Sequence, residues 1–494
     1  MYHEHPLRIL KYSAKNIWLL IFPFIRGLRT YHFSKDFFYT WIQGAWKDLL
    51  VIGAIILFGL IRWFFSIIDV HENELIHRDG VFIRVTTHVP LANISCSTVE
   101  NPVHLGAFGA RRLSCDTRAG IFKTADLKML VNESTCAAIM KHIPDTAEKN
   151  KAAELKRPSW LSILLFSVFF SSGFSGTVYV AMFFFKGGDI AHDIISMSQS
   201  TLTKETAKLT DKLLLKIPAM ALVIGAFFIG SWFVSFVVNL LRYAGFRIET
   251  DNKVMKVSYG ILNRVEYRIR LSHVNYTDLR QNLVMKLMGA VSLNVSCAGY
   301  GAVKNRLPVL MPVKKEKDIG RELEAMGIVG GVQNTYKARI AGAGSYLLLP
   351  IIAAAAVHPL YNATRGLVIS FFPKLEELLH FAAVMAEIPL IWFIIVKAAA
   401  LLTSGITFYD DSILIRCSKW NSFHTVVGDR KNVVKVEVEQ NLLQRMSKRC
   451  AVSIWFGSEE YKRYKVKALS EADGLKIAET LGCGISLRNT EISR

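Results

Sequence analysis

Six apolar runs divide the chain into alternating apolar and polar stretches, and this alternation limits what the chain can fold into. Three of the runs are long and nearly free of charge: Leu49–Ile68, Trp160–Phe185 and Ile217–Leu241. Each has about the 20 residues that a helix needs to cross the hydrocarbon core of a bilayer. We therefore expect a protein that alternates membrane-spanning helices with folded polar modules.

The other three runs are less regular. The fifth begins near Tyr346 and contains Pro350 and Pro359, and the sixth, Phe381–Leu402, contains two ionisable residues. The first, Ile17–Ile25, is short and holds a proline, so within residues 17–32 a full span and a re-entrant or interfacial segment both stay open.

The runs come in pairs, and a polar segment of similar length follows each pair. This order predicts an α+β membrane protein with six transmembrane helices in three pairs, each pair followed by a small β-sandwich or barrel that ends in a helix. The predicted division is an N-terminal segment with the first helix pair, 1–67; a first module, 68–158; a second pair, 159–241; a second module, 242–343; a third pair, 344–403; and a third module, 404–494.

Charge predicts the side of the membrane on which the modules lie. The chain has 60 Lys and Arg against 40 Asp and Glu, a net charge of +20. Most of the basic residues fall in the N-terminal segment and the three polar segments, which the positive-inside rule places in the cytoplasm together with both termini. The 7 cysteines are scattered and form no CxxC pair, which agrees with a reducing compartment.

The three polar segments repeat one another in sequence. A constant offset of 180 residues aligns Gly80 with Gly260 and Leu91 with Leu271, and an offset of 159 aligns Gln281-Asn282-Leu283 with Gln440-Asn441-Leu442. Alternating β-rich stretches and a closing helical stretch predict a small antiparallel sheet capped by one helix in each segment. The closing helices are expected at Glu133–His142, Lys314–Met326 and Ser470–Leu481.

These residues resemble the bacterial pleckstrin-homology-like (PH domain-containing) integral membrane proteins of the YdbT kind. Three features carry the likeness: the turn at Gly260, the Gln-Asn-Leu turn at Gln281 and Gln440, and the glycine that ends the turn at Gln281, Gly289. The third segment departs from the pattern with Lys448 in place of this glycine, and the first has Asn101-Pro102-Val103 in place of Gln-Asn-Leu.

The resemblance implies PH-like modules on the inner face of a bacterial plasma membrane and no catalytic chemistry. It also implies a link to resistance against membrane-active antimicrobial peptides, often beside a smaller partner with a single PH-like module. A homo-oligomer is a further expectation. Nucleic acid is not an expected partner, because modules tethered this close to a membrane already face an anionic surface.

The second segment is the most basic and supplies the candidate contacts with anionic lipid headgroups. Alternation along one strand predicts that Arg268 and Arg270 point the same way. The alternative is an ordinary solvated flank without a specific ligand. The full set of candidate residues is Arg264, Arg268, Arg270, Arg280 and Lys286.

Two ionisable residues lie in the sixth apolar run. Glu387 could line a polar path or make a contact inside a helix bundle, and Lys397 is expected to snorkel toward the inner face. The Gln-Asn-Leu turn is interpreted as structural, with a partner contact as the alternative.

The sequence contains no HExxH, no GxxxxGK[ST] and no GxSxG motif, and its 13 histidines do not cluster at metal-ligand spacing. We therefore expect a non-enzymatic protein without a metal or other cofactor that acts in membrane or protein interactions. A transporter or lipid-handling protein is the alternative.

Overall fold

The computed structural model describes residues 1–15, 35–118, 125–143, 154–171, 219–251, 253–300, 309–316, 332–371, 376–457 and 462–482. The predicted first apolar run Ile17–Ile25, most of the predicted helix Lys314–Met326 and large parts of the third run lie outside these residues.

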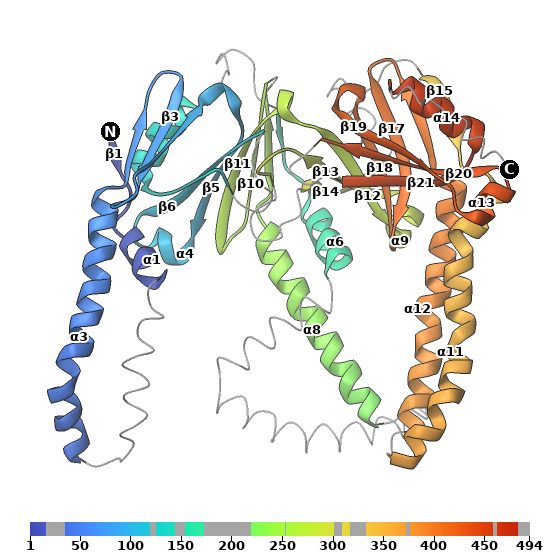
Figure 1. The fold of residues 1–494 in the computed structure, drawn as a ribbon, viewed down its shortest axis with the longest axis horizontal. Coiled ribbons are helices and arrows are strands. Elements are labelled where there is room, and N and C mark those ends of the chain that lie inside the picture. The colour runs from blue at the N-terminus through green and yellow to red at the C-terminus, as the bar shows by residue number, and fades with distance from the viewer. Residues whose placement is uncertain are drawn as a thin grey trace, which may run out of the picture. The chain divides into compact units, whose positions relative to one another are not determined.

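One order of elements occurs three times along the chain (Figure 1). Three strands form an antiparallel meander, a short 3-10 turn and a fourth strand follow, then a short helix and two more strands. In the first repeat these are β2 (Ile67–Val70), β3 (Glu74–Asp79), β4 (Val85–Pro90), η2 (Leu91–Asn93), β5 (Ile94–Pro102), α4 (Val103–Gly106), β6 (Ala110–Thr117) and β7 (Leu127–Asn132), with a closing helix α5 (Glu133–His142).

The second and third repeats follow the same order. The second comprises β9 (Arg247–Thr250), β10 (Val254–Tyr259), β11 (Asn263–Arg270), η3 (Leu271–His273), β12 (Tyr276–Asn282), α9 (Leu283–Leu287), β13 (Ala290–Ser296) and β14 (Val309–Lys315). The third comprises β16 (Gly405–Tyr409), β17 (Ser412–Lys419), β18 (Ser422–Asp429), η7 (Arg430–Asn432), β19 (Val433–Glu439), α13 (Leu442–Met446), β20 (Arg449–Phe456), β21 (Lys462–Ser470) and α14 (Glu471–Thr480).

The sequence register of the repeats is therefore confirmed in the structure. Leu91, Leu271 and Arg430 each begin the 3-10 turn that follows the meander, one position beyond the strand on which the alignment would place them. The closing helices expected at Glu133–His142 and Ser470–Leu481 are α5 and α14.

In each repeat, a short strand from far upstream in the chain pairs with the first strand of the meander. β1 (Tyr2–His3) pairs with β2, β8 (Glu154–Lys156) with β9, and β15 (Val332–Lys337) with β16. Between the strand and the repeat lie the helices α1 (Arg8–Lys15), α3 (Lys35–Phe64), α6 (Trp160–Phe170), α8 (Ala219–Tyr243), η5 (Ile340–Gly342), α11 (Gly344–Phe371) and α12 (Glu376–Thr403).

Neighbouring repeats share sheets. β5 of the first repeat pairs with β11 of the second, so that one seven-stranded sheet has the order β7-β6-β5-β11-β10-β9-β8. β12 of the second repeat pairs with β18 of the third in another seven-stranded sheet, β14-β13-β12-β18-β17-β16-β15. β1 to β4 and β19 to β21 form the two smaller sheets.

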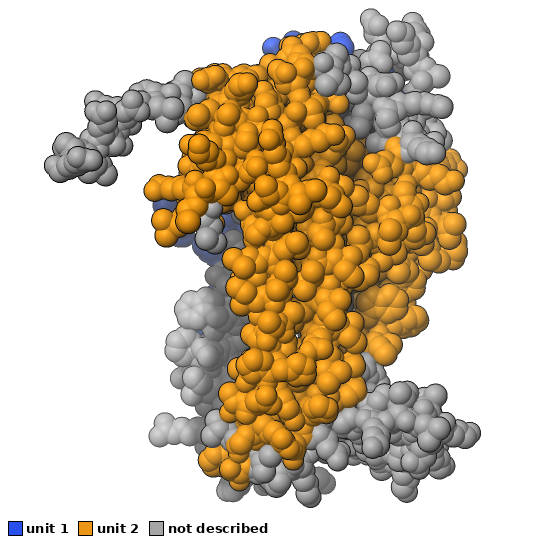
Figure 2. All heavy atoms as spheres, turned by 90° about the vertical axis from the view of Figure 1, so that its right-hand side faces the viewer, with its two compact units in different colours: residues 1–156, 247–274, 297–306 blue, residues 157–246, 275–296, 307–494 orange. Residues whose placement is uncertain are grey.

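The chain forms two compact units, coloured blue and orange in Figure 2. Unit 1 comprises residues 1–156, 247–274 and 297–306, and unit 2 comprises 157–246, 275–296 and 307–494, so the second repeat contributes to both. Side chains such as Leu113, Met129 and Ile139 are fully buried in unit 1, and Phe408 and Ile454 are fully buried in unit 2.

The prediction of six transmembrane helices in three pairs is wrong. Among the described residues, two helical stretches are long and apolar enough to cross a membrane: Gly344–Gly366 in α11 and Leu379–Thr403 in α12. The other apolar helical stretches, Leu50–Phe64, Trp160–Phe170 and Phe227–Tyr243, are shorter. Over the described ranges, the fold is corrected to four antiparallel sheets with two candidate spans.

The case of α3 gives the physical reason. Its amino-terminal half contains Lys47 and Asp48, and strand β2 already begins at Ile67. The predicted span Leu49–Ile68 therefore contains only 15 residues of apolar helix. At 1.5 Å per residue this stretch covers about 22 Å, less than the roughly 30 Å of bilayer hydrocarbon.

Candidate functional site

Helices α11 and α12 expose their apolar side chains instead of burying them. Only 6% of the apolar window of each helix is buried inside the protein. Leu349 in α11 and Ile388 in α12 are 77% and 59% exposed. A core helix of a water-soluble protein would bury this surface, so two bare apolar helices of this length mark a surface suited to lipid.

The two ionisable residues predicted in the sixth apolar run both have partners. Glu387 Oε1 lies 2.9 Å from Nε2 of His358, so this polar contact joins α12 to α11. Lys397 Nζ donates to Ser418 Oγ at 3.0 Å and to the carbonyl of Trp420 at 2.9 Å, and it lies over the ring of Phe393. Lys397 thereby ties α12 to the turn between β17 and β18.

The turn between the second and third strands of each meander exposes large apolar side chains. Phe82 in the first repeat is 88% exposed, Ile261 in the second 62% and Trp420 in the third 78%. In unit 1 the ring of Phe82 stacks on Phe58 of α3, with 6.3 Å between ring centroids. In both units this turn therefore contacts an apolar helix that precedes the meander.

The short helix after the fourth strand also presents apolar side chains to the outside. In α9 Leu287 is 79% exposed, and in α13 Leu442 and Met446 are 78% and 85% exposed. Tryptophan and lysine beside apolar surface are typical of the boundary between headgroups and hydrocarbon. We call the exposed apolar residues of these turns and short helices the rim of each unit. The rim of unit 1 comprises Phe82, Ile83, Val103, Phe108, Ile261 and Leu262, and the rim of unit 2 comprises Val284, Leu287, Met288, Trp420, Leu442 and Met446.

Hydrogen bonds of the Gln-Asn-Leu turn confirm its structural role. Gln281 Nε2 donates to the carbonyl of Ala290 at 2.9 Å, and Gln440 makes the equivalent bond to Arg449 at 2.9 Å. Asn282 caps α9 by accepting a hydrogen bond from the backbone of Met285 at 2.7 Å. The same residue types therefore fold the same turn in repeats two and three.

The arginines proposed to contact lipid differ in what surrounds them. Arg264 is exposed and lies two residues after the exposed turn residue Leu262 of the second repeat. Arg268 donates to Glu266 at 3.3 Å and to the carbonyl of Met140 at 3.4 Å. Arg270 donates to the carbonyls of Leu91 and Ala92 in the first repeat.

The other two predicted residues lie in unit 2. Arg280 points into the protein and donates to Asp278 at 2.8 Å, while Lys286 Nζ lies 4.2 Å from the ring centre of Phe423. Within the predicted set, Arg264 and Lys286 thus make no side-chain hydrogen bond or ion pair with the described part of the chain. Sequence alternation could not reveal these partners, since they come from other repeats and loops.

A buried charge cluster joins repeats two and three. Asp278 on β12 is 2% exposed and accepts hydrogen bonds from His424 Nδ1 on β18, at 3.0 Å to each carboxylate oxygen. Burial alone would raise the pKa of Asp278, but the charge and hydrogen bond of His424, aided by Arg280, lower this pKa to about 2. Tyr464 lies beside the cluster, and burial raises the pKa of its hydroxyl.

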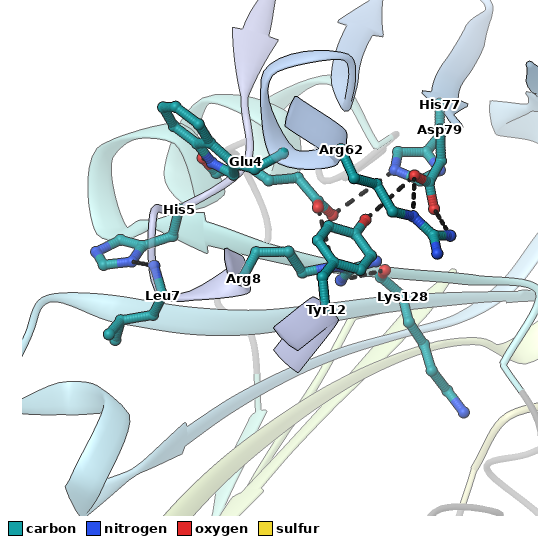
Figure 3. A network of polar contacts seen from close by, with 10 residues as sticks. Glu4, His5, Leu7, Arg8, Tyr12, Arg62, His77, Asp79 and Lys128 are labelled. Carbon is teal, nitrogen blue, oxygen red and sulfur yellow. Dashed lines mark hydrogen bonds and ion pairs between the residues drawn. The ribbon is translucent and has the colours of Figure 1, made fainter. Parts of the chain in front are cut away.

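A second polar cluster, within unit 1, joins the amino-terminal residues and the end of α3 to strand β3 (Figure 3). Glu4 lies 3.0 Å from Arg8 and 3.6 Å from His77, and all three side chains are nearly buried. Arg62 at the end of α3 donates to both carboxylate oxygens of Asp79, at 3.2 and 3.0 Å. The sequence reading missed this cluster because its members lie far apart in the chain.

Within the described residues, no group of three or more His, Cys, Asp or Glu side chains is placed to hold a metal ion.

Comparison with protein families gives one match, to the bacterial PH domain, over residues 17–146 and 205–326. These two regions together cover half of the chain and include most of the first and second repeats. The chain belongs to the bacterial PH domain family. Searches of curated proteins and of solved structures give no match. Membership makes a membrane or protein interaction role the general expectation for this bacterial PH domain protein.

Proposed function

We propose that this bacterial PH domain protein is anchored in the plasma membrane by α11 and α12 and that its modules contact anionic headgroups at the membrane surface. The observation that carries the proposal is the exposed apolar surface of α12, which runs with one intervening residue into β16 of the third repeat. An anchor so close to the module holds it within about one or two Debye lengths, roughly 8 Å each at physiological salt, of the lipid surface.

The rim and Arg264 supply the contacts in this proposal. Apolar side chains such as Leu262 enter the boundary between headgroups and acyl chains, and Arg264 beside it attracts anionic headgroups. A basic residue near such a surface contributes about 1 kcal/mol. Arg268 and Arg270 already donate hydrogen bonds to backbone carbonyls. They contribute less to lipid binding, because a headgroup would have to compete with those carbonyls.

A spin label measures this contact directly. We would place a nitroxide on cysteine at Leu262 in the full chain reconstituted in vesicles that contain phosphatidylglycerol, with a label at Lys476 on α14 as the matched exposed control. The label at 262 should be shielded from a water-soluble relaxation agent and open to oxygen, and Arg264→Gln should reduce that shielding. Equal exposure of the two labels to the water-soluble agent would refute the contact.

We further propose that the anchored protein is not an enzyme and that both termini lie in the cytoplasm. The native thiols are poor reporters of topology, because Cys96, Cys297 and Cys450 are buried and burial raises the pKa of Cys450 to about 11. A cysteine introduced at exposed Lys476 should react with a membrane-impermeant maleimide only after the cells are permeabilised. Labelling of intact cells would place the third repeat outside.

Resistance to membrane-active antimicrobial peptides, with a smaller single-module PH-like partner or as a homo-oligomer, is the proposed physiological role. It is supported by the resemblance to the YdbT-like proteins. Deleting the gene should lower the concentration of such a peptide that inhibits growth, and the intact gene should restore it. Unchanged sensitivity across several such peptides would refute this role without contradicting the proposed membrane contact.

A further inference from the structure

A polar cavity of about 310 Å³ lies in unit 2 at the point where α12 ends and β16 begins. It draws on both the second and the third repeat, and it is distinct from the rim. Its lining residues include Gln281, Lys286, Glu316, Lys337, Gly405 and Arg416.

One row of residues across the sheet forms the floor of the cavity. Lys337 on β15 is opposite Gly405 on β16, Gly405 is opposite Arg416 on β17, and Arg416 is opposite Thr425 on β18. Neighbouring strands lie about 4.8 Å apart, so the backbones of Lys337 and Arg416 are separated by roughly 10 Å. Gly405 lines the cavity and carries no side chain, so no group from this position fills the floor between Lys337 and Arg416. Space for a small group is therefore left between the two cations.

The lining is rich in positive charge. Lys286 reaches the cavity from α9, so three cationic side chains line it against one carboxylate, Glu316. Among the described residues no ion pair satisfies Lys286, Lys337 or Arg416. Burial lowers the pKa of Lys286; Glu316 raises it, and the charge of Arg416 lowers it again. Lys286 and Arg416 are thus near enough to repel each other, and a bound anion would relieve that repulsion.

Donors of the protein occupy part of the carboxyl end of α12, which lies at the cavity. A helix carboxyl end carries partial negative charge on its free carbonyls. Here Ser404 donates to the carbonyl of Ala400 through both its backbone nitrogen, at 2.9 Å, and its hydroxyl, at 2.6 Å, and Thr403 Oγ1 donates to Ala399 at 2.9 Å. The carbonyl of Ser404 accepts from Ala338 at 3.0 Å. These carbonyls are therefore occupied by donors of the protein.

We propose that the cavity binds a phosphate group presented by an anionic lipid headgroup, held by Lys286, Lys337 and Arg416. Phosphate oxygens suit the planar donor fork of arginine and the point charges of lysine. The choice of a lipid source rests on the proposed membrane anchoring. It is supported by Leu402, which lines the same cavity at the end of the candidate span and is 72% exposed, so that an acyl chain could leave along α12.

The test uses the full chain purified in an uncharged detergent and titrated by calorimetry with three probes. These are short-chain phosphatidylglycerol, short-chain phosphatidylcholine and inorganic phosphate. The variants are Arg416→Gln and Lys337→Gln, both at exposed positions and hence compatible with folding. Lys476→Gln on α14 removes the same charge from unit 2 outside the cavity and serves as the control.

We expect phosphatidylglycerol to bind more tightly than phosphatidylcholine. Either cavity variant should weaken its binding about tenfold, as expected for a hydrogen bond to a charged group, and raised salt should weaken it further. The control should leave its binding unchanged. Inorganic phosphate binding as tightly as the lipid, with the same sensitivity to the variants, would overturn the lipid source in favour of a free phosphate.

The same phosphatidylglycerol affinity for wild type, both cavity variants and the control would overturn the site altogether. Because the titration is done in detergent, this result is separate from a failure of the proposed anchoring, which would appear as protein extracted from membranes by alkaline carbonate.

Discussion

At the residue scale, the turn after the short helix holds a residue in a left-handed conformation in each repeat. Gly109 has φ 69° and Gly289 has φ 59°, while the third repeat holds Lys448 at φ 50° in the same turn. A side chain at such an angle costs about 1–2 kcal/mol relative to glycine. The sequence departure of the third repeat is therefore a local cost and not a change of fold.

Lys448→Gly should raise the stability of the protein by about 1 kcal/mol, because glycine adopts this conformation freely. The reciprocal change Gly289→Ala should lower stability by a similar amount, although there is open space for the added Cβ. Thermal unfolding midpoints of both variants in detergent measure the effect. A lower midpoint for Lys448→Gly would show that the lysine side chain makes a compensating contact.

The buried carboxylate of Asp278 predicts a pH dependence. Its pKa is lowered from 3.8 to about 2 in the folded state. A lowered carboxyl pKa stabilises the fold by about 2 kcal/mol above the unfolded pKa, and this contribution is lost as pH falls through about 2. The unfolding midpoint of the wild type should therefore drop between pH 4 and pH 2.

Asp278→Asn should flatten that drop and lower stability at neutral pH by about 3–5 kcal/mol, because Arg280 and His424 lose their buried partner. Asp429→Asn is the matched control, since Asp429 pairs with Lys431 at 3.1 Å on the surface, where an ion pair contributes about 1 kcal/mol or less. An equal pH profile for wild type and Asp278→Asn would contradict the assignment.

Residue patterns predicted the local turns but not long-range partners. Gln281 and Gln440 fold equivalent turns because their hydrogen bonds reach only nine residues along the chain. Arg270 instead reaches the carbonyl of Leu91, 179 residues away, and no periodicity encodes that contact. Alternation correctly placed Arg268 and Arg270 on one strand face, yet the neighbouring repeat covers that face.

At the element scale, helix length was the least predictable feature. The apolar composition of Leu49–Ile68 predicted a single span, although the last residues of this run belong to strand β2, which pairs with β3. The strands β1, β8 and β15 were equally hidden, because two to six residues far upstream of a sheet carry no periodic signal. The closing helices α5 and α14 were predictable from their length and from local start signals such as Ser470, whose hydroxyl caps α14.

The junction of α3 with the sheet of unit 1 depends on Arg62 and Asp79. Their side chains are 31% and 21% exposed, and Tyr12 of α1 also donates to Asp79 at 3.2 Å. A double-mutant cycle with Arg62→Met and Asp79→Asn should give a coupling energy of about 1–3 kcal/mol in the free energy of unfolding, obtained from the unfolding midpoints. The exposed pair Lys435 and Glu437 serves as comparison and should give less than 1 kcal/mol. Additive effects at Arg62 and Asp79 would show that the helix is held by apolar packing alone.

At the scale of the whole molecule, the repeats are not independent modules, because neighbouring repeats share sheets. β11 pairs with β5 over seven consecutive residue pairs, and β12 pairs with β18 over another seven. Sequence repetition indicated three similar modules, and each repeat does keep the same element order. Repetition carries no information about which strand edges join, because identical edges could pair within a module or between modules.

The shared sheets lead to a prediction about fragments. The segment 242–343, expressed alone, would leave β11 and β12 as unpaired edges, and exposed edges of this length pair with other chains. We expect this fragment to aggregate or to form oligomers, whereas the full chain in detergent should be monodisperse or form a defined oligomer. Size-exclusion chromatography with light scattering distinguishes these outcomes, and Arg268→Pro in the fragment, which blocks edge pairing on β11, should reduce the association. A monomeric fragment that unfolds cooperatively would mean that the second repeat can close its own sheet, and that the pairing of β5 with β11 is an addition to a finished module and not part of its core.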